Sequence, residues 1–126
     1  MIEDRFDAAG NLLFVRFTGE LSEEDLVKYA QRAAANPAIP PAHDELIDLS
    51  RAEIADLQSH TLRRIAELFA GGDRTPERSR VALVAADDVS YGLSRMYQAF
   101  RSHSPLDLRV FRDVAEARAW LGLPPE

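Results

Sequence analysis

The chain has 126 residues and a mass of 14.1 kDa, the size of one ordinary domain, so we expect residues 1–126 to form a single domain. Its hydrophobic content of 46% is typical of a globular protein and too high for a disordered one. The net charge of −6 disfavours nucleic acid or an anionic membrane as the main partner, because both call for a basic surface.

The chain contains no cysteine, which excludes disulfides and thiolate zinc sites. The first ten residues are acidic and lack the apolar stretch of a secretion signal, and no apolar run is long enough to span a membrane. We therefore expect a cytoplasmic protein with no membrane span.

The first expected elements are two strands joined by a tight turn. Residues 1–6 and 12–19 flank a short polar segment, in which Gly10 and Asn11 accept positive φ at low cost. This pattern predicts an antiparallel hairpin.

A helix is expected to follow the hairpin directly. Ser22 and Asp25 have the spacing of a capping box, and Leu21 and Leu26 have the spacing of a hydrophobic staple. The helix should therefore begin near Ser22 and run to about Ala35.

A proline-rich connection at residues 36–44 leads to a short strand at 45–49. A second helix follows, with an apolar stripe at i, i+3, i+4 and i+7 that consists of Leu62, Ile65, Ala66 and Phe69. Gly71 and Gly72 are expected to end it.

The segment 81–86 is apolar without alternation, as in a strand covered on both faces, and we expect it to be the central strand. A third helix should follow. Its predicted buried face consists of Val89, Leu93, Met96, Tyr97 and Phe100.

The last strand is expected at 108–112, and a final helix at about 113–121, where Asp113 and Glu116 have capping-box spacing. The predicted order is ββαβαβαβα. The fold class is therefore α/β, with a mixed, mostly parallel sheet of about five strands packed with four helices.

Four segments resemble a known family. They are VRFTGELSEEDL (15–26), ELIDLS (45–50), ALVAADDVSYGLSRMYQAF (82–100) and RVFRDVAEARAWL (109–121). The chain resembles the STAS superfamily and, within it, the SpoIIAA-like branch of small stand-alone proteins. The resemblance implies a non-catalytic regulatory or protein-binding module, similar to bacterial anti-sigma-factor antagonists, with a protein partner still to be identified.

In those antagonists, a loop ending in DSSG carries a serine that a partner kinase phosphorylates. Counted from Asp48 without gaps, Asp56 matches the aspartate, but Ser59 falls on the glycine, so the motif is not intact. A shift of one residue places Ser59 at the start of the second helix, where a phosphate would meet the positive end of the helix dipole. Ser59 is thus a candidate phosphorylation site, although residue preference favours a simple N-cap.

A second candidate region follows the strand at 81–86, on the carboxyl side of the sheet, where open α/β sheets bind ligands. Cap preference favours Asp88 or Ser90 as the cap of the next helix. Tyr91 is expected to be exposed beside Arg95, and Gly92 to permit either close packing or the approach of another backbone or a ligand. The candidate partner or ligand surface is therefore Asp56, Ser59, Asp88, Ser90, Tyr91 and Arg95.

Other chemistry is poorly represented in the sequence. His43, His60 and His103 are widely spaced, which disfavours a metal site. No G-x-S-x-G motif, cysteine nucleophile or phosphate-binding glycine loop is present. We expect no metal, no cofactor and no enzymatic activity.

The alternative function is the binding of a small apolar or lipid-like ligand, because the SpoIIAA-like branch is similar in layout to Sec14-type lipid-binding domains. The second and third helices could part to form a pocket lined by Leu62, Ile65, Phe69, Met96 and Phe100. Tight interior packing favours a filled core instead. A homodimer through an apolar helix face is also possible.

Overall fold

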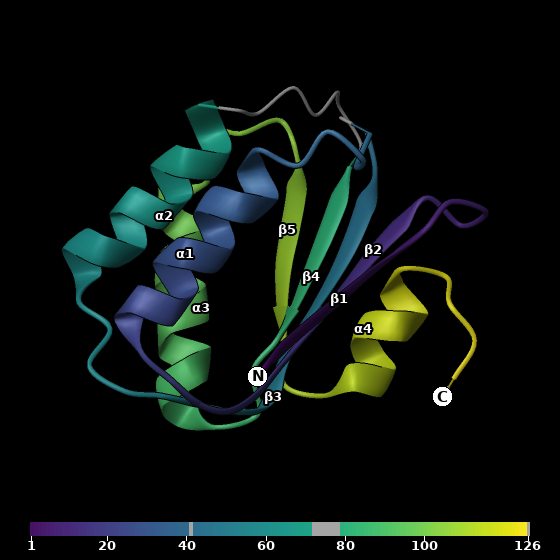
Figure 1. Ribbon diagram of the computed structural model, residues 1–126. Coiled ribbons are helices and arrows are strands. Elements are labelled where there is room, and N and C mark those ends of the chain that lie inside the picture. Colours follow the sequence, from purple (N-terminus) through teal and green to yellow (C-terminus); the bar gives the residue numbers. More distant parts are fainter. Residues whose placement is uncertain (41, 72–78, 126) are drawn as a thin grey trace.

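The computed structural model describes residues 1–40, 42–71 and 79–125 (Figure 1). The predicted order ββαβαβαβα is confirmed. The elements are β1 (Ile2–Asp7), β2 (Leu12–Leu21), α1 (Glu23–Ala34), β3 (Asp44–Ile54), α2 (Ser59–Gly71), β4 (Arg80–Val84), α3 (Asp88–Phe100), β5 (Asp107–Phe111) and α4 (Val114–Trp120). Gly72, which was expected to end the second helix, lies outside the described residues.

The five strands lie in the sheet in their order along the chain, β1-β2-β3-β4-β5. β1 pairs with β2 in antiparallel fashion, and the remaining pairs are parallel. The central strand is β3, so the prediction that the segment 81–86 is central was wrong. β3 is also longer than expected, because residues 51–54 pair with residues 18–21 of β2 beyond a register shift between Arg16 and Thr18.

The helices form two unequal layers. Crossovers between parallel strands are nearly always right-handed, and here the strand order never reverses, so successive crossovers fall on the same face of the sheet. Figure 1 shows α1, α2 and α3 together on one face and α4 on the other. The described sheet therefore has no point of strand-order reversal, which is where open α/β sheets usually form their ligand crevice.

Alternation along the strands divides the core between the two faces. Leu13, Val15 and Phe17 of β2 point toward α1, where the ring of Phe17 meets that of Tyr29 edge-on at 5.3 Å between centroids. On the opposite face, α4 covers a separate cluster. That cluster consists of Leu46, Ala82, Val84, Ala117 and Leu121.

The predicted capping box of the first helix is confirmed. The Ser22 hydroxyl accepts a hydrogen bond from the Asp25 N–H, and the Asp25 carboxylate accepts one from the Ser22 N–H. At α4, Asp113 is the N-cap and accepts from the Ala115 N–H.

The predicted buried face of the third helix was partly wrong. Val89 and Met96 are 63% and 38% exposed, whereas Ser90 and Ser94 are buried. Arg101, just after the helix, is also buried. The buried face of α3 is therefore rotated about the helix axis relative to the predicted apolar stripe. Because serine is small, Ser90 and Ser94 let α3 lie close to the strands. The packing gained in this way outweighs the cost of exposing Val89 and Met96 to solvent.

Candidate functional site

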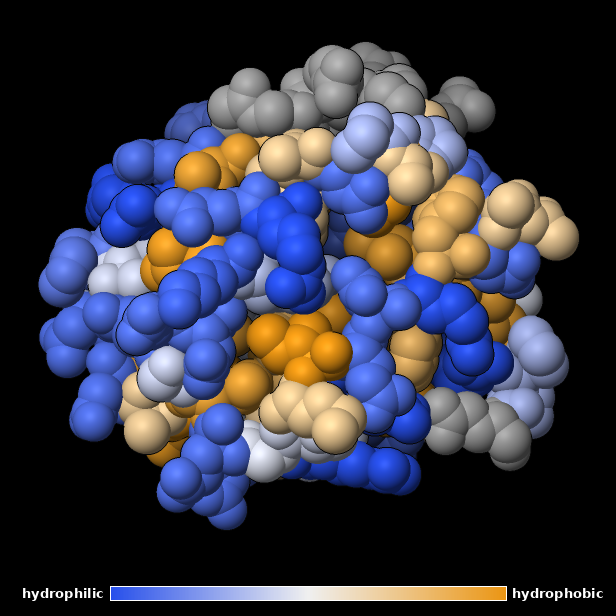
Figure 2. Space-filling view, viewed as in Figure 1, coloured by the Kyte–Doolittle hydropathy of each residue, from blue (hydrophilic) through white to orange (hydrophobic). Residues whose placement is uncertain are grey.

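A cavity of about 210 Å³ lies between the helix layer and the sheet. Its walls come from α1, α2, α3 and the inner faces of β3, β4 and β5. The lining includes three of the side chains named for a possible pocket, Leu62, Ile65 and Phe69. The expectation of a filled core is therefore wrong for this part of the interior. Figure 2, viewed as in Figure 1, shows hydrophobic side chains at the surface in patches between hydrophilic ones.

The lining of the cavity is more polar at one end than at the other. Along β3 it extends from Glu45 to Ile54. Six polar lining residues lie where β3 and β4 begin and where α1 and α3 end, beside apolar ones such as Ile39 and Phe69; the six are Asn36, His43, Glu45, Ser79, Tyr97 and Arg101. The opposite end is lined by Leu26, Ile54, Leu57 and Leu62. This distribution matches an amphiphile better than a fully apolar molecule.

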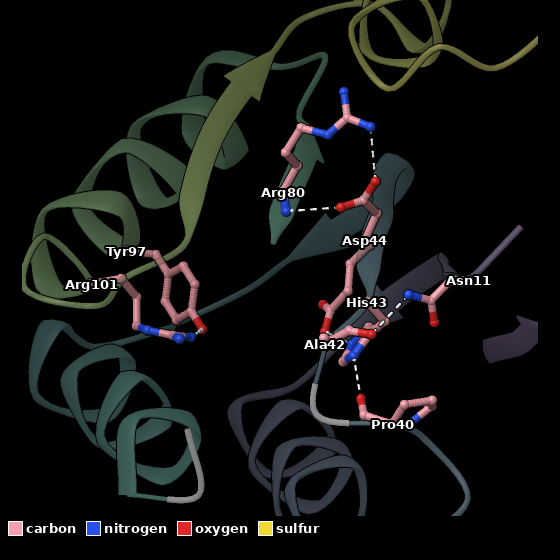
Figure 3. A network of polar contacts seen from close by, with 9 residues as sticks. Asn11, Pro40, Ala42, His43, Asp44, Arg80, Tyr97 and Arg101 are labelled. Atoms are coloured by element: carbon pink, nitrogen blue, oxygen red, sulfur yellow. Dashed lines mark hydrogen bonds and ion pairs between the residues drawn. The ribbon is translucent and has the colours of Figure 1, made fainter. Parts of the chain in front are cut away.

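On the α3 side of the polar end, Arg101 is buried at 7% exposure. Its Nε donates to the Ser104 hydroxyl at 3.1 Å, and its Nη1 donates to the Tyr97 hydroxyl at 2.9 Å. The guanidinium also lies over the rings of Phe69 and Tyr97, at 6.0 and 5.9 Å from their centroids. Figure 3 shows Tyr97 and Arg101 pointing toward each other from α3. Hydroxyls and aromatic faces thus hold a cation at the cavity wall.

On the β3 side, His43 makes two short contacts. Its Nδ1 lies 2.7 Å from the Pro40 carbonyl oxygen (Figure 3), and its Nε2 lies 2.7 Å from Oε1 of Glu45. A carbonyl and a carboxylate only accept hydrogen bonds, so the protonated ring, with an N–H at each nitrogen, is the form that satisfies both contacts. Burial disfavours this charge, but the hydrogen bond and charge of Glu45, with Pro40 and Asp44, outweigh burial and raise the pKa of His43 above 6.5.

The two residues predicted near the second helix are both exposed. Asp56 has a positive φ of 57° in the connection before α2. Ser59 is the first residue of α2 and does not occupy the cap position, because the Gln58 carbonyl accepts from the N–H groups of Thr61 and Leu62. The N-cap prediction for Ser59 was therefore wrong.

The positive end of α2 is occupied by Glu23 of α1. The Glu23 carboxylate accepts from the Gln58 N–H at 2.7 Å. This backbone hydrogen bond, with smaller contributions from the Thr61 hydroxyl and the His60 charge, lowers the pKa of Glu23. No local pattern in the sequence signals this contact, because Glu23 and Gln58 lie 35 residues apart in different parts of the chain.

The residues predicted after the fourth strand lie at the opposite end of the sheet from the polar end of the cavity. The N-cap of α3 is Asp87, which accepts from the Ser90 N–H at 2.8 Å, so the prediction of Asp88 or Ser90 as the cap was wrong. Ser90 is buried at 1% exposure. Asp88 instead pairs with Arg112 at 2.8 Å.

Tyr91 is half-buried, not exposed as predicted. The cation over its ring is Arg112, at 4.6 Å from the centroid. Arg95 is exposed on α3. The structure therefore brings Asp88 and Tyr91 together through Arg112. Sequence reasoning missed this contact because Arg112 follows β5 and is 24 residues from Asp88 along the chain.

Gly92 has open space around it. A Cβ built there meets no atom within 4 Å, and its φ is not positive. Neither close packing nor a neighbouring backbone explains this glycine.

The described part of the chain contains neither a cluster of metal ligands nor a membrane-spanning helix. No cluster of three or more His, Asp or Glu residues there could hold a metal ion. Among the described helices, none has the length and apolar character needed to cross a bilayer.

The sheet and its helix layers define an open α/β domain with a partly open, largely apolar cavity beneath α1, α2 and α3. A family model described as SpoIIAA-like matches residues 12–122. The chain belongs to the SpoIIAA-like family, the branch of the STAS superfamily that its sequence resembles.

A solved structure with the same fold is an uncharacterised protein of the DUF3478 family with a SpoIIAA-like fold, from Shewanella loihica PV-4. The two chains superpose with a TM-score of 0.59 at 21% sequence identity, and the match covers 95% of this chain and 93% of the other. At this identity the likeness shows the fold alone. No curated protein matches the chain.

Proposed function

We propose that this protein binds a small apolar or lipid-like ligand in the cavity between the sheet and α1, α2 and α3, and that it does so without catalysing a reaction. The observation that supports the proposal is the cavity itself, with a largely apolar lining and polar side chains gathered toward one end. Its volume exceeds the roughly 150 Å³ of an apolar protein cavity that binds benzene.

The apolar lining supports an apolar ligand. Apolar surface that leaves water against side chains such as Leu62 and Ile65 contributes about 25 cal/mol per Å². A ligand that fills the space restores the missing contacts, and its binding free energy adds to the stability of the folded state.

Binding is favoured over catalysis by the state of the polar groups. Both ring nitrogens of His43 are engaged, one by the Pro40 carbonyl and one by the Glu45 carboxylate, so neither is free to act as a base toward a molecule in the cavity. Glu45, the carboxylate in the described lining, is engaged in the same contact.

The proposal is tested by filling the cavity. Ala33 of α1 lines it, and Ala33→Leu adds apolar volume there. Ala99 is exposed on α3 and does not line the cavity, so Ala99→Leu is the matched control. We expect the uncharged dye N-phenyl-1-naphthylamine to fluoresce with the wild type and with Ala99→Leu, and to lose at least tenfold in affinity with Ala33→Leu.

The native occupant is identified by mass spectrometry of protein freshly purified from its own host. A non-covalent mass present under native conditions and absent after denaturation is the expected result. Equal dye binding by both leucine variants, together with a bare native mass, would reject ligand binding in this cavity.

The regulatory or protein-binding role is a second proposal, and one surface favours it. The solvent face of α3 is exposed and mostly small or apolar, with Val89, Gly92, Arg95, Met96 and Ala99. A partner bound there should be recovered with the wild type from its own host and lost with the double variant Arg95→Ala, Met96→Ala. Recovery of the same protein with both forms would argue against this surface. A native mass of twice the chain would indicate the homodimer instead.

A further inference from the structure

Tyr29 is the tyrosine that α1 contributes to the cavity wall. The lining residues of α1 include Leu26, Tyr29, Ala30 and Ala33, which recur at the spacing of one helical face. Of these four side chains, three are aliphatic, so it is Tyr29 that gives this face a polar atom. Tyr29 is 7% exposed, which means that more than nine-tenths of the residue is buried.

The ring of Tyr29 is held by two contacts. Phe17 of β2 meets it edge-on at 5.3 Å between centroids, and the guanidinium of Arg32, one turn further along α1, lies 5.4 Å from the ring centroid. Both contacts are made by the ring and neither by the hydroxyl. The hydrocarbon part of the side chain is therefore sufficient to hold Tyr29 in place.

The hydroxyl of Tyr29 makes no hydrogen bond within the described structure. Buried hydroxyls nearly always have a partner, because burial without one costs free energy. No side-chain polar atom of the described residues is both enclosed by protein and without a hydrogen bond, so the Tyr29 oxygen is open to a small molecule. Tyr97, a second tyrosine of the described lining, differs in that its hydroxyl accepts from Arg101 at 2.9 Å.

The charged groups that act on the Tyr29 hydroxyl come from three elements. Burial has the largest effect on its pKa, followed by the carboxylates of Glu45 in β3 and Asp4 in β1, and all three raise it, whereas Arg32 of α1 lowers it. The net result is a raised pKa, so the hydroxyl keeps its proton. Tyr29 is thus a neutral hydrogen-bond donor in surroundings that disfavour an anion.

We propose that Tyr29 recognises the polar head of the ligand by donating its hydroxyl hydrogen to an uncharged oxygen, and that the ligand is a neutral amphiphile, such as a long-chain alcohol or ester. A carboxylate head at the same position would meet the like charge of Glu45, which also lines the cavity. The alkyl chain lies against apolar lining such as Leu57 and Leu62. This inference rests on the proposed function, because it names the class of ligand for the same cavity.

The first experiment compares urea unfolding of protein stripped of bound molecules. Tyr29→Phe removes the hydroxyl and keeps the ring against Phe17 and Arg32. Since no hydrogen bond within the protein is lost, its unfolding midpoint should equal that of the wild type or exceed it. Tyr97→Phe loses the bond from Arg101, so its midpoint should fall. A fall in Tyr29→Phe as large as that in Tyr97→Phe would show that the Tyr29 hydroxyl is bonded within the protein and would overturn the inference.

The second experiment measures displacement of N-phenyl-1-naphthylamine by 1-decanol and by decanoate at neutral pH. The wild type should bind 1-decanol more tightly than decanoate. Tyr29→Phe should weaken 1-decanol binding by about three- to tenfold, the range expected for loss of one neutral hydrogen bond. Its affinity for the dye should not change, because the dye nitrogen is conjugated with two aromatic rings and is a poor acceptor. Tyr91→Phe, which loses a hydroxyl outside the described lining, should bind 1-decanol as the wild type does.

The outcomes separate this inference from the proposed function. If the dye binds but Tyr29→Phe loses no affinity for 1-decanol, Tyr29 does not contact the head group, and the inference is overturned while ligand binding stands. Tighter binding of decanoate than of 1-decanol by the wild type would overturn the neutral head group in the same way. If the dye does not bind to the wild type at all, the proposed function is rejected, and the inference with it.

Discussion

Single residues determine several local features of this fold, and the effect of Gly92 on stability is the clearest one to test. Glycine in a helix costs about 1 kcal/mol relative to alanine, and the space around Gly92 is open. We therefore expect Gly92→Ala to raise the free energy of unfolding by about 0.5–1 kcal/mol in urea denaturation. Gly19→Ala is the contrasting control, because Gly19 has a positive φ of 78°, which strains any other residue. A loss of stability in Gly92→Ala would show that this glycine has a role that the structure does not reveal.

Ser59 offers a second test at the same scale. A negative charge at the first residue of a helix normally interacts well with the helix dipole. Here the Glu23 carboxylate already accepts from the Gln58 N–H, so a phosphate or Glu at Ser59 would meet a like charge. We expect Ser59→Glu to stabilise the protein less in the wild type than in a Glu23→Gln background, measured by a double-mutant cycle of unfolding free energies. Equal effects in both backgrounds would leave Ser59 open to phosphorylation at no electrostatic cost.

Residue-scale prediction from the sequence succeeded where the signal was local. The Ser22 and Asp25 capping box forms within one turn, and it was confirmed. Ser59 does lie at the start of the second helix, but its predicted N-cap role and the predicted exposure of Tyr91 were wrong. Glu23 and Arg112 approach from other elements, and no spacing along the sequence encodes such contacts.

At the scale of elements, the two faces of the sheet should respond differently to the loss of a side chain. Leu46 of β3 is fully buried against α4, whereas Leu83 of β4 borders the cavity. Leu46→Ala should cost about 2–5 kcal/mol, because it opens a void in a close-packed cluster. Leu83→Ala should cost less, because one side of Leu83 already lacks protein neighbours.

The comparison is made by urea unfolding of both variants with ligand removed. Leu83→Ala should also alter dye affinity, and Leu46→Ala should not. If Leu83→Ala lowers the free energy of unfolding more than Leu46→Ala does, the side chain of Leu83 is packed on all sides in solution and does not border a cavity.

All the elements could be predicted from the sequence, because hydrophobic periodicity and caps mark each of them. The orientation of α3 could not. Its apolar stripe includes Val89 and Met96, but the surface of the sheet accepts Ser90 and Ser94 more closely, and tertiary packing overrode the pattern. The extension of β3 to Ile54 was missed for a similar reason, since it depends on the length of its partner β2.

For the whole molecule, occupancy of the cavity should set the measured stability. Protein unfolded, stripped of bound molecules by organic extraction and refolded should melt at a lower temperature than protein taken directly from its host. Added N-phenyl-1-naphthylamine should restore part of the difference, with a gain that grows with the logarithm of dye concentration. Identical melting temperatures for host-derived and stripped protein, with no effect of dye, would mean that the cavity is unfilled in the cell.

The family and the fold could be predicted from the sequence, but the cavity could not. The side chains that line it, such as Leu62, Ile65 and Phe69, are the same types that fill a solid core. Whether these side chains pack against one another or leave a cavity depends on how α1, α2 and α3 are spaced from one another and from the sheet. The surface predicted after the fourth strand stays a prediction, but the rule behind it assumes a reversal of strand order that this sheet lacks.

The unbroken strand order also bears on how the chain folds as the ribosome releases it. Each strand pairs with the one made just before it, so no strand has to wait for a distant partner or insert between two that have already paired. The sheet can grow from the hairpin by one helix and one strand at a time, and every intermediate exposes a single growing edge. Among the described helices, α4 follows all five strands in the sequence and packs on the other face, so the second side of the core forms only after the whole sheet has been made.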